Sequence, residues 1–178
     1  RAPEQRDAVL AKFPAGKTLS LGVVDGRNIW KNNLSASLAL LEKAVAKLGK
    51  DRVIAASSCS LLHTPVDLDV EDKLDPQIKN WMAFAKQKLG EIATLAKGAD
   101  KGRDAIAAEL AASDAVAQDR KTSTRIHNTA VGARLDAVTD AMLRRNNAFA
   151  MRQRIQHAAY KLPLFPTTSI GSFPQTAE

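Results

Sequence analysis

One strand–helix–strand pattern constrains the fold of this 178-residue chain more than any other feature of its sequence. Residues 18–24 and Val53–Ser57 are nearly continuous apolar runs of strand length. Between them, Leu34–Leu48 carries leucine, alanine and valine at helical spacing, and Gly49 follows it as a C-cap glycine would. Because two strands joined through a helix need a crossover connection, they are expected to lie parallel. Their apolar character predicts that both faces of the sheet are covered.

Three further helices are predicted downstream of this unit. The first spans 76–96, with Gly98 closing it, and the second spans 102–118. In the third, apolar residues repeat at three- and four-residue steps throughout 129–160. One continuous helix of that length would extend roughly 48 Å, which suits a strut between two domains, and Pro163 would stop it.

The C-terminal residues predict the start of another domain. Residues 165–170 are rich in β-branched and aromatic side chains, as a strand should be, and Gly171 and Ser172 follow as a turn. Because the chain ends six residues after Ser172, this strand has no sheet to join within the chain. The first residue, Arg1, is not a methionine. We therefore expect the chain to be a piece of a longer protein.

Composition narrows the class of protein. No run of about 18 apolar residues occurs, so no transmembrane helix is expected. With 45% hydrophobic and 25% charged residues, the chain has the composition of an ordinary soluble protein. Its single cysteine, Cys59, has no second cysteine with which to form an internal disulfide, which fits a reducing cytoplasm.

The net charge of +7 reflects basic residues concentrated in 120–161, where only Asp136 and Asp140 oppose them. A protein that binds single-stranded nucleic acid would add aromatic side chains for base stacking, and this segment has only Phe149 and Tyr160. A solvated helix surface, or a non-enzymatic helical module that docks an acidic partner, is therefore favoured over nucleic-acid binding.

Polar side chains follow both predicted strands, at the edge where (β/α)8 barrels bind their ligands. Asp25 and Arg27 follow the first strand, where a turn with a surface ion pair is favoured over substrate contact. Cys59 follows the second strand, four residues before His63. A Cys–His nucleophile pair would need a third, orienting group, so a buried thiol is favoured. Metal binding is not predicted, because one cysteine and three scattered histidines form no ligand cluster.

Three blocks of sequence carry a family resemblance. The stretch LPLFPTTSIGSFPQT at 162–176 resembles the opening of the catalytic domain of cobalamin-independent methionine synthases. Residues 53–68 resemble the end of that family's N-terminal barrel, and residues 21–30 precede them in the order that the family uses. The resemblance covers nearly the whole chain and preserves the order and spacing of the blocks.

The resemblance implies an α/β fold class with a partial (β/α)8 barrel, a long helical interdomain connector and the first strand of a second barrel. Residues 1–97 would be the C-terminal part of the N-terminal barrel, including its last two strands. Residues 98–161 would form the helical linker, and 162–178 would begin the C-terminal catalytic barrel. Two strands of eight leave open sheet edges, so we expect the piece by itself to be marginally stable at best.

The resemblance also implies a reaction, the transfer of a methyl group from 5-methyltetrahydropteroyltri-L-glutamate to L-homocysteine, which gives L-methionine. In the family, the triplet that matches Ile170, Gly171 and Ser172 binds homocysteine, and methionine after the transfer. The family enzyme needs no cobalamin; it uses zinc to deprotonate the thiol and a positioned acid to protonate the folate amine. The zinc ligands and the acid belong to later parts of the catalytic barrel. This chain is therefore expected to hold no catalytic residue and no metal ligand, and to be inactive alone, as part of a monomeric cytoplasmic enzyme.

Overall fold

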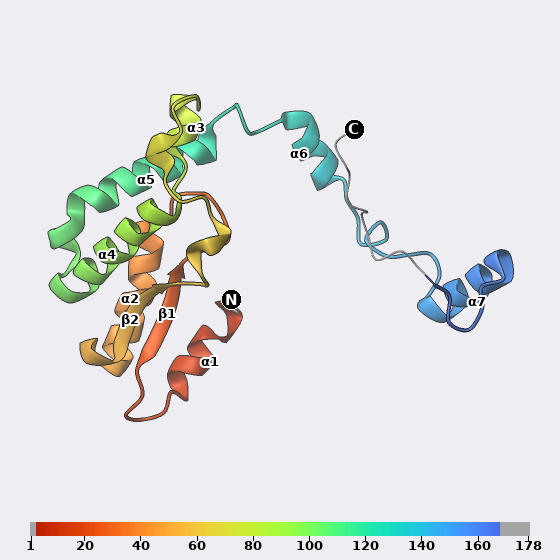
Figure 1. The fold of residues 1–178 in the computed structure, drawn as a ribbon, viewed down its shortest axis with the longest axis horizontal. Helices are drawn as coiled ribbons and strands as arrows, with labels where there is room; N and C mark the ends of the chain where they lie inside the picture. Colours follow the sequence, from red (N-terminus) through yellow and green to blue (C-terminus); the bar gives the residue numbers. More distant parts are fainter. Residues whose placement is uncertain (1–2, 168–178) are drawn as a thin grey trace. The chain divides into compact units, whose positions relative to one another are not determined.

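The first strand–helix–strand unit forms as the sequence predicts. The computed structural model describes residues 3–167, in which β1, Leu19–Val24, pairs in parallel with β2, Val53–Ser57 (Figure 1). Helix α2, Leu34–Leu48, connects the two strands. The pairing shifts by one residue after Gly22, at the carboxyl end of β1.

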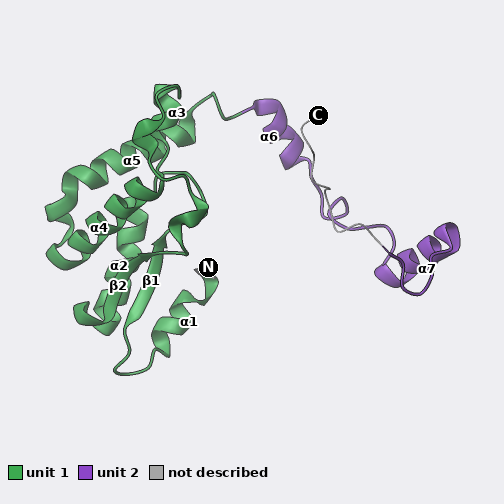
Figure 2. Cartoon of the chain, in the orientation of Figure 1, with its two compact units in different colours: residues 1–127 green, residues 128–178 purple. Residues whose placement is uncertain are grey.

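The remaining elements fall into two compact units, residues 1–127 and 128–178, called unit 1 and unit 2 (Figure 2). The other described helices and 3₁₀ turns are α1 (Arg6–Ala11), α3 (Pro76–Asn80), α4 (Ala85–Lys101), α5 (Ala107–Thr122), α6 (Thr129–Asp136), α7 (Phe149–Tyr160), Pro3–Gln5, Lys50–Arg52, Leu61–His63, Leu68–Val70 and Arg103–Ile106. Among these described helices, none is both long enough and apolar enough to cross a membrane.

Helix α2 begins and ends where its sequence favours. The Asn33 side chain accepts a hydrogen bond from the Ala36 N–H at 2.9 Å, which satisfies one free donor of the first turn. At the other end, Gly49 has a φ of 91°, a conformation that the missing Cβ permits at little cost. The predicted C-cap is confirmed.

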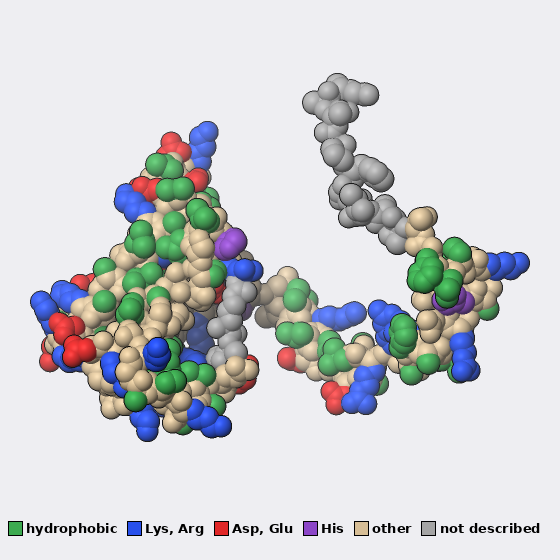
Figure 3. Space-filling view, turned by 60° about the horizontal axis from the view of Figure 1, so that its bottom comes forward, with side chains coloured by type: hydrophobic (Ala, Val, Ile, Leu, Met, Phe, Trp, Pro, Cys, Tyr) green, Lys and Arg blue, Asp and Glu red, His purple; other side chains and the backbone are tan. Residues whose placement is uncertain are grey.

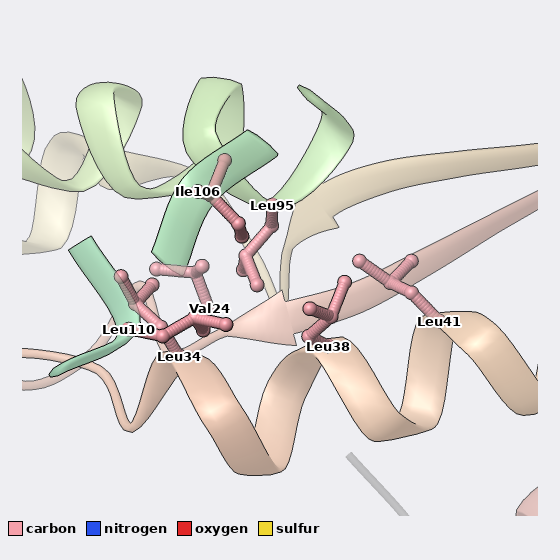
Figure 4. Packing of buried hydrophobic residues seen from close by; sticks show 7 residues of the cluster. All are labelled: Val24, Leu34, Leu38, Leu41, Leu95, Ile106 and Leu110. Atoms are coloured by element: carbon pink, nitrogen blue, oxygen red, sulfur yellow. The ribbon is translucent and has the colours of Figure 1, made fainter. Parts of the chain in front are cut away.

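The main hydrophobic core of unit 1 lies between α2, α4, α5 and one face of the sheet. Its buried residues are Val24, Leu34, Leu38, Leu41, Leu95, Ile106 and Leu110 (Figure 4). Alternate strand residues, among them Leu21, Val23 and Val53, pack against this cluster, because side chains two apart on a strand share a face. Ile106 and Leu110 lie within the predicted linker 98–161 and contribute to the core of unit 1.

The opposite face of the sheet is largely bare in the part of the chain that the structure describes. Ile54 is 54% exposed, and Ser20 and Gly22 are also exposed. The prediction that both faces of the sheet are covered is therefore wrong for the described residues. Helices α2 and α4 both pack on the face that carries Leu21 and Val53, and no described helix covers the other face to the same extent. A mixed α/β unit with a two-stranded parallel sheet is consistent with part of a barrel domain.

The prediction of a single helix at 76–96 is wrong, since two helices occupy this region. Helix α3 ends at Asn80 and α4 begins at Ala85. Residues 81–84 between them are buried, and the Ala83 N–H donates to the Ile29 carbonyl at 2.8 Å. Backbone pairing with a distant segment therefore replaces the local helical hydrogen bonds that the spacing predicted.

Gly98 does not close α4, so this prediction is also wrong. The helix continues to Lys101 and ends at Gly102, which has a φ of 89°. Gly98 lies against the Ile106 side chain, where a Cβ has no room. The glycine thus serves close packing inside the helix. The next prediction, a helix at 102–118, agrees with α5 except that its first turn is a 3₁₀ turn and that the helix continues to Thr122.

In unit 2, two short helices replace the single helix predicted at 129–160. Residues 137–148 between α6 and α7 form no regular helix. Figure 3 shows hydrophobic side chains at the surface of this unit among Lys and Arg side chains; Leu135 and Phe149 are 70% and 68% exposed. A long helix gains most of its stability from packing its apolar face, and no such packing occurs within the described part of unit 2.

The end of α7 and the predicted final strand also differ from expectation. Helix α7 ends at Tyr160, where Lys161 adopts a left-handed conformation with a φ of 49°, so the helix ends before Pro163. Residues 165–167 are not in a strand. The rest of the predicted strand, with Ile170, Gly171 and Ser172, lies outside the described residues.

An ion-pair cluster holds the loop after β2 to the first turn of α4. Lys86 Nζ lies 2.8 Å from Asp67 Oδ2 and 2.9 Å from Asp69 Oδ2. The Gln87 amide donates to Asp67 Oδ1 at 2.8 Å. The hydrogen bonds that Asp67 accepts from Lys86, from the Asp69 N–H and from Gln87, in that order of effect, lower its pKa to about 2.

The depressed pKa of Asp67 predicts acid sensitivity of this loop. Because the folded pKa of about 2 lies below the ordinary value of 3.8, the stabilisation is present above pH 3.8 and is lost as the pH falls through about 2. Replacing Lys86 with methionine should return the carboxyl titration toward 3.8, as followed by the side-chain NMR shift of Asp67. An Asp67 pKa that is the same in both proteins would contradict the contact between Lys86 and Asp67.

Candidate functional site

The carboxyl ends of the two parallel strands border an open hollow of about 1050 Å³, which we call the strand-end hollow. It extends along β1 to the carboxyl-terminal edge of the sheet, where α/β proteins bind their ligands. Its lining residues are Arg6, Ser20, Leu21, Gly22, Val23, Asp25, Arg27, Asn32, Ser57 and Ser58. The structure therefore brings together Asp25, Arg27, Ser57 and Ser58, whereas Cys59 and His63 do not line this hollow.

Asp25 organises the turn that follows β1. Its Oδ1 accepts a hydrogen bond from the Arg27 N–H at 2.8 Å, and its Oδ2 accepts one from the Asn28 amide at 3.0 Å. The predicted turn is confirmed. The predicted ion pair is wrong, because Arg27 meets Asp25 through its backbone, and no salt bridge joins the two side chains in the described structure. An exposed guanidinium at the mouth of the hollow is therefore free of this carboxylate.

Ser58 ties the second strand to the same turn. Its N–H donates to the Val24 carbonyl at 2.7 Å, and its hydroxyl accepts a hydrogen bond from the Gly26 N–H at 3.2 Å. The hydroxyl also lies 3.4 Å from Asp25 Oδ1. The ends of the two strands are thus fixed to each other through backbone and side-chain hydrogen bonds.

Cys59 and His63 differ in their surroundings. The thiol of Cys59 is partly buried and lies 3.9 Å from the Ser58 hydroxyl. Gly26 approaches it so closely that a Cβ on that glycine would lie 3.1 Å from the sulfur. His63 is exposed at the end of a 3₁₀ turn. Partial burial agrees with the expectation of a packed thiol.

The sequence interpretation missed a buried lysine that contacts the loop after β1. Lys88 on α4 is 1% exposed, and its Nζ donates to the Trp30 carbonyl at 2.9 Å and to Asn28 Oδ1 at 3.2 Å. Burial lowers the pKa of this lysine, and the charges of Glu91 and Asp25 oppose that shift. The ammonium therefore anchors the loop after β1.

Glu91, one turn further along α4, holds the next part of the same loop. Its Oε1 accepts a hydrogen bond from the Asn32 N–H at 2.8 Å, whereas Oε2 is buried without a hydrogen-bond partner. Burial raises the pKa of this carboxyl, while the Asn32 hydrogen bond and Lys88 lower it. The spacing of residues 84, 88, 91, 95 and 98 on one helix face would have revealed the buried lysine and the partly buried glutamate.

The described residues contain no group of three His, Cys, Asp or Glu side chains placed to hold a metal ion. Zinc therefore has no fitting site in this part of the chain, since a zinc site needs three or four such ligands. The candidate homocysteine residues Ile170, Gly171 and Ser172 lie beyond the described range.

Comparison with known proteins gives a consistent assignment. The family described as cobalamin-independent synthase, N-terminal domain, matches residues 1–49. Over all 178 residues, the chain is 53% identical to proteins of Coxiella burnetii (strain RSA 493) and Nitrobacter winogradskyi, and 52% identical to one of Acidithiobacillus ferrooxidans. All three are named 5-methyltetrahydropteroyltriglutamate–homocysteine methyltransferase, and the chain spans 23% of the length of each. Along its whole length, the chain is thus similar to a segment of the cobalamin-independent methionine synthases.

Proposed function

We propose that this chain forms part of an enzyme that transfers a methyl group from 5-methyltetrahydropteroyltri-L-glutamate to L-homocysteine. The observation that supports this most strongly is 53% identity over the full 178 residues to proteins named for that reaction. The enzyme would be a cytoplasmic monomer without cobalamin. Zinc would supply a thiolate at neutral pH, held by ligands outside this chain.

The proposed contribution of the chain is structural and substrate-binding. Residues 1–97 would close the N-terminal barrel, 98–161 would link the barrels, and 162–178 would begin the catalytic barrel. Ile170, Gly171 and Ser172 would hold homocysteine through main-chain groups and the serine hydroxyl, because a glycine just beyond a strand lets a ligand approach the backbone. The interaction-module alternative has no observation that favours it over this assignment.

A chimera tests the homocysteine site. The chain replaces the matching segment of the C. burnetii protein, and homocysteine binding is measured by calorimetry with Gly171 or with valine there. Crowding the backbone should weaken affinity about tenfold or more, since overpacking typically costs 1–3 kcal/mol. Gly132→Ala is the matched control, because a Cβ there meets no atom within 4 Å. Equal homocysteine affinity in the folded valine variant and in the parent would contradict the proposed homocysteine site.

A further inference from the structure

A second hollow in unit 1, of about 390 Å³, is bordered by the loop after β1, the last two turns of α5 and the residues that follow it. We call it the cationic hollow. Lys31, Arg120 and Lys121 line it, with His127 beside them. No acidic residue is among its ten lining residues in the described chain. The strand-end hollow shares only Asn32 with it.

Arg120 is held in place by an aromatic platform. Its guanidinium carbon lies 4.0 Å from the centroid of the Trp30 ring, a cation–π contact. Trp30 is itself fixed, because its N–H donates to Asn28 Oδ1 at 3.1 Å and its carbonyl accepts from Lys88. A stacked guanidinium keeps its N–H edge available for an oxyanion in a defined orientation.

The carboxylate nearest to Arg120 in sequence, that of Asp119, accepts hydrogen bonds from other side chains. Asp119 precedes Arg120, yet its Oδ2 accepts a hydrogen bond from the Trp81 indole at 2.7 Å, and its Oδ1 accepts one from the Gln77 amide at 3.1 Å. No salt bridge in the described structure includes Arg120 or Lys121. The two basic side chains in the last turn of α5 are thus not paired with a carboxylate at salt-bridge distance.

Lys31 brings a third positive charge from a different segment. Its Nζ donates to the neutral Asn80 side chain at 2.9 Å, which leaves two of its three donors available. Burial lowers the pKa of Lys31, and the negative charge of Glu91 opposes this shift. A bound anion would favour the charged form further. Basic residues are common at helix C-termini, but that effect does not account for Lys31.

We infer that the cationic hollow binds a small organic or inorganic oxyanion, whose oxygens accept hydrogen bonds from Arg120, Lys121 and Lys31. Three cations that line one hollow, none of them in a salt bridge of the described structure, repel one another, and an oxyanion between them relieves that repulsion. Val116 and Ile126 add apolar lining suited to a short carbon chain. This inference does not depend on the proposed methyl transfer.

Calorimetry on the 178-residue chain at low ionic strength tests the site with three probes, namely inorganic phosphate, citrate and tri-L-glutamate. The probe that binds most tightly separates phosphate from carboxylate recognition. Arg120→Met should weaken binding about tenfold or more, because hydrogen bonds to charged groups are the stronger ones. Lys101→Met, which makes the same change in net charge at an exposed helix end, should leave affinity within about twofold.

Lys121→Met and Lys31→Met provide independent variants, each checked for parental helical content by circular dichroism. Weakened binding in either supports the site even where Arg120→Met disturbs the packing on Trp30. Absence of binding by all three probes, or an equal loss in Lys101→Met, would overturn the inference.

Discussion

Replacing Leu38 with alanine is expected to lower the free energy of unfolding of unit 1 by about 2–5 kcal/mol. Leu38 is 0% exposed and lies in the core cluster formed by α2, α4, α5 and the sheet. Removing its side chain forfeits the burial of its methyl groups and leaves a cavity that close-packed neighbours fill only in part. Urea unfolding followed by circular dichroism measures the loss.

Leu62 provides the matched control for that experiment, because it is 91% exposed in a 3₁₀ turn. Its replacement by alanine should change the free energy of unfolding by no more than about 0.5 kcal/mol. If the free energy of unfolding of the parent chain is smaller than the loss caused by Leu38→Ala, the variant will be unfolded in buffer and will show no cooperative transition. Equal effects of the two leucines would show that the assigned core is wrong.

Gly26→Ala is expected to destabilise the chain by about 1–3 kcal/mol, although it adds a single methyl group. A Cβ at this buried position would lie 2.8 Å from the Cys59 carbonyl oxygen and 3.1 Å from its sulfur. Because the nearest atom belongs to the backbone, the strand ends must separate to make room. That movement would also stretch the hydrogen bond from the Gly26 N–H to Ser58 at the strand-end hollow.

Gly90→Ala should have the opposite effect. Gly90 lies inside α4, and a Cβ there meets no atom within 4 Å. Alanine in a helix interior is favoured over glycine by roughly 0.5–1 kcal/mol, so this variant should be slightly more stable. Thermal unfolding of both variants against the parent is the measurement, and a Gly26→Ala protein as stable as Gly90→Ala would contradict the close approach of the strand ends.

Local signals in the sequence predicted the elements whose stability is local. Helix α2 carries a capping asparagine, a periodic apolar face and a terminal glycine, and all three act within the segment itself. Asp25 predicted its turn for the same reason, since its carboxylate accepts from the N–H two residues later. The polar residues after β1 and β2 were correctly grouped because parallel strands end at one edge.

The errors came from partners that are distant in sequence. Residues 81–84 leave the helix because Ala83 pairs with Ile29, more than fifty positions earlier. Lys88 resembles a surface lysine until the fold places the Trp30 carbonyl and Asn28 within its reach. In unit 2, the apolar repeat of 129–160 predicted a long helix, yet no described element of that unit covers its apolar side chains.

We propose above that this chain acts as a segment of a methyl-transfer enzyme. The most direct measurement is methyl transfer from 5-methyltetrahydropteroyltri-L-glutamate to homocysteine by the chimera in which the chain replaces the matching segment of the C. burnetii protein. We expect methionine formation by the chimera and none by the 178-residue chain alone. A chimera that folds like the C. burnetii protein but forms no methionine, or turnover by the isolated chain, would contradict it.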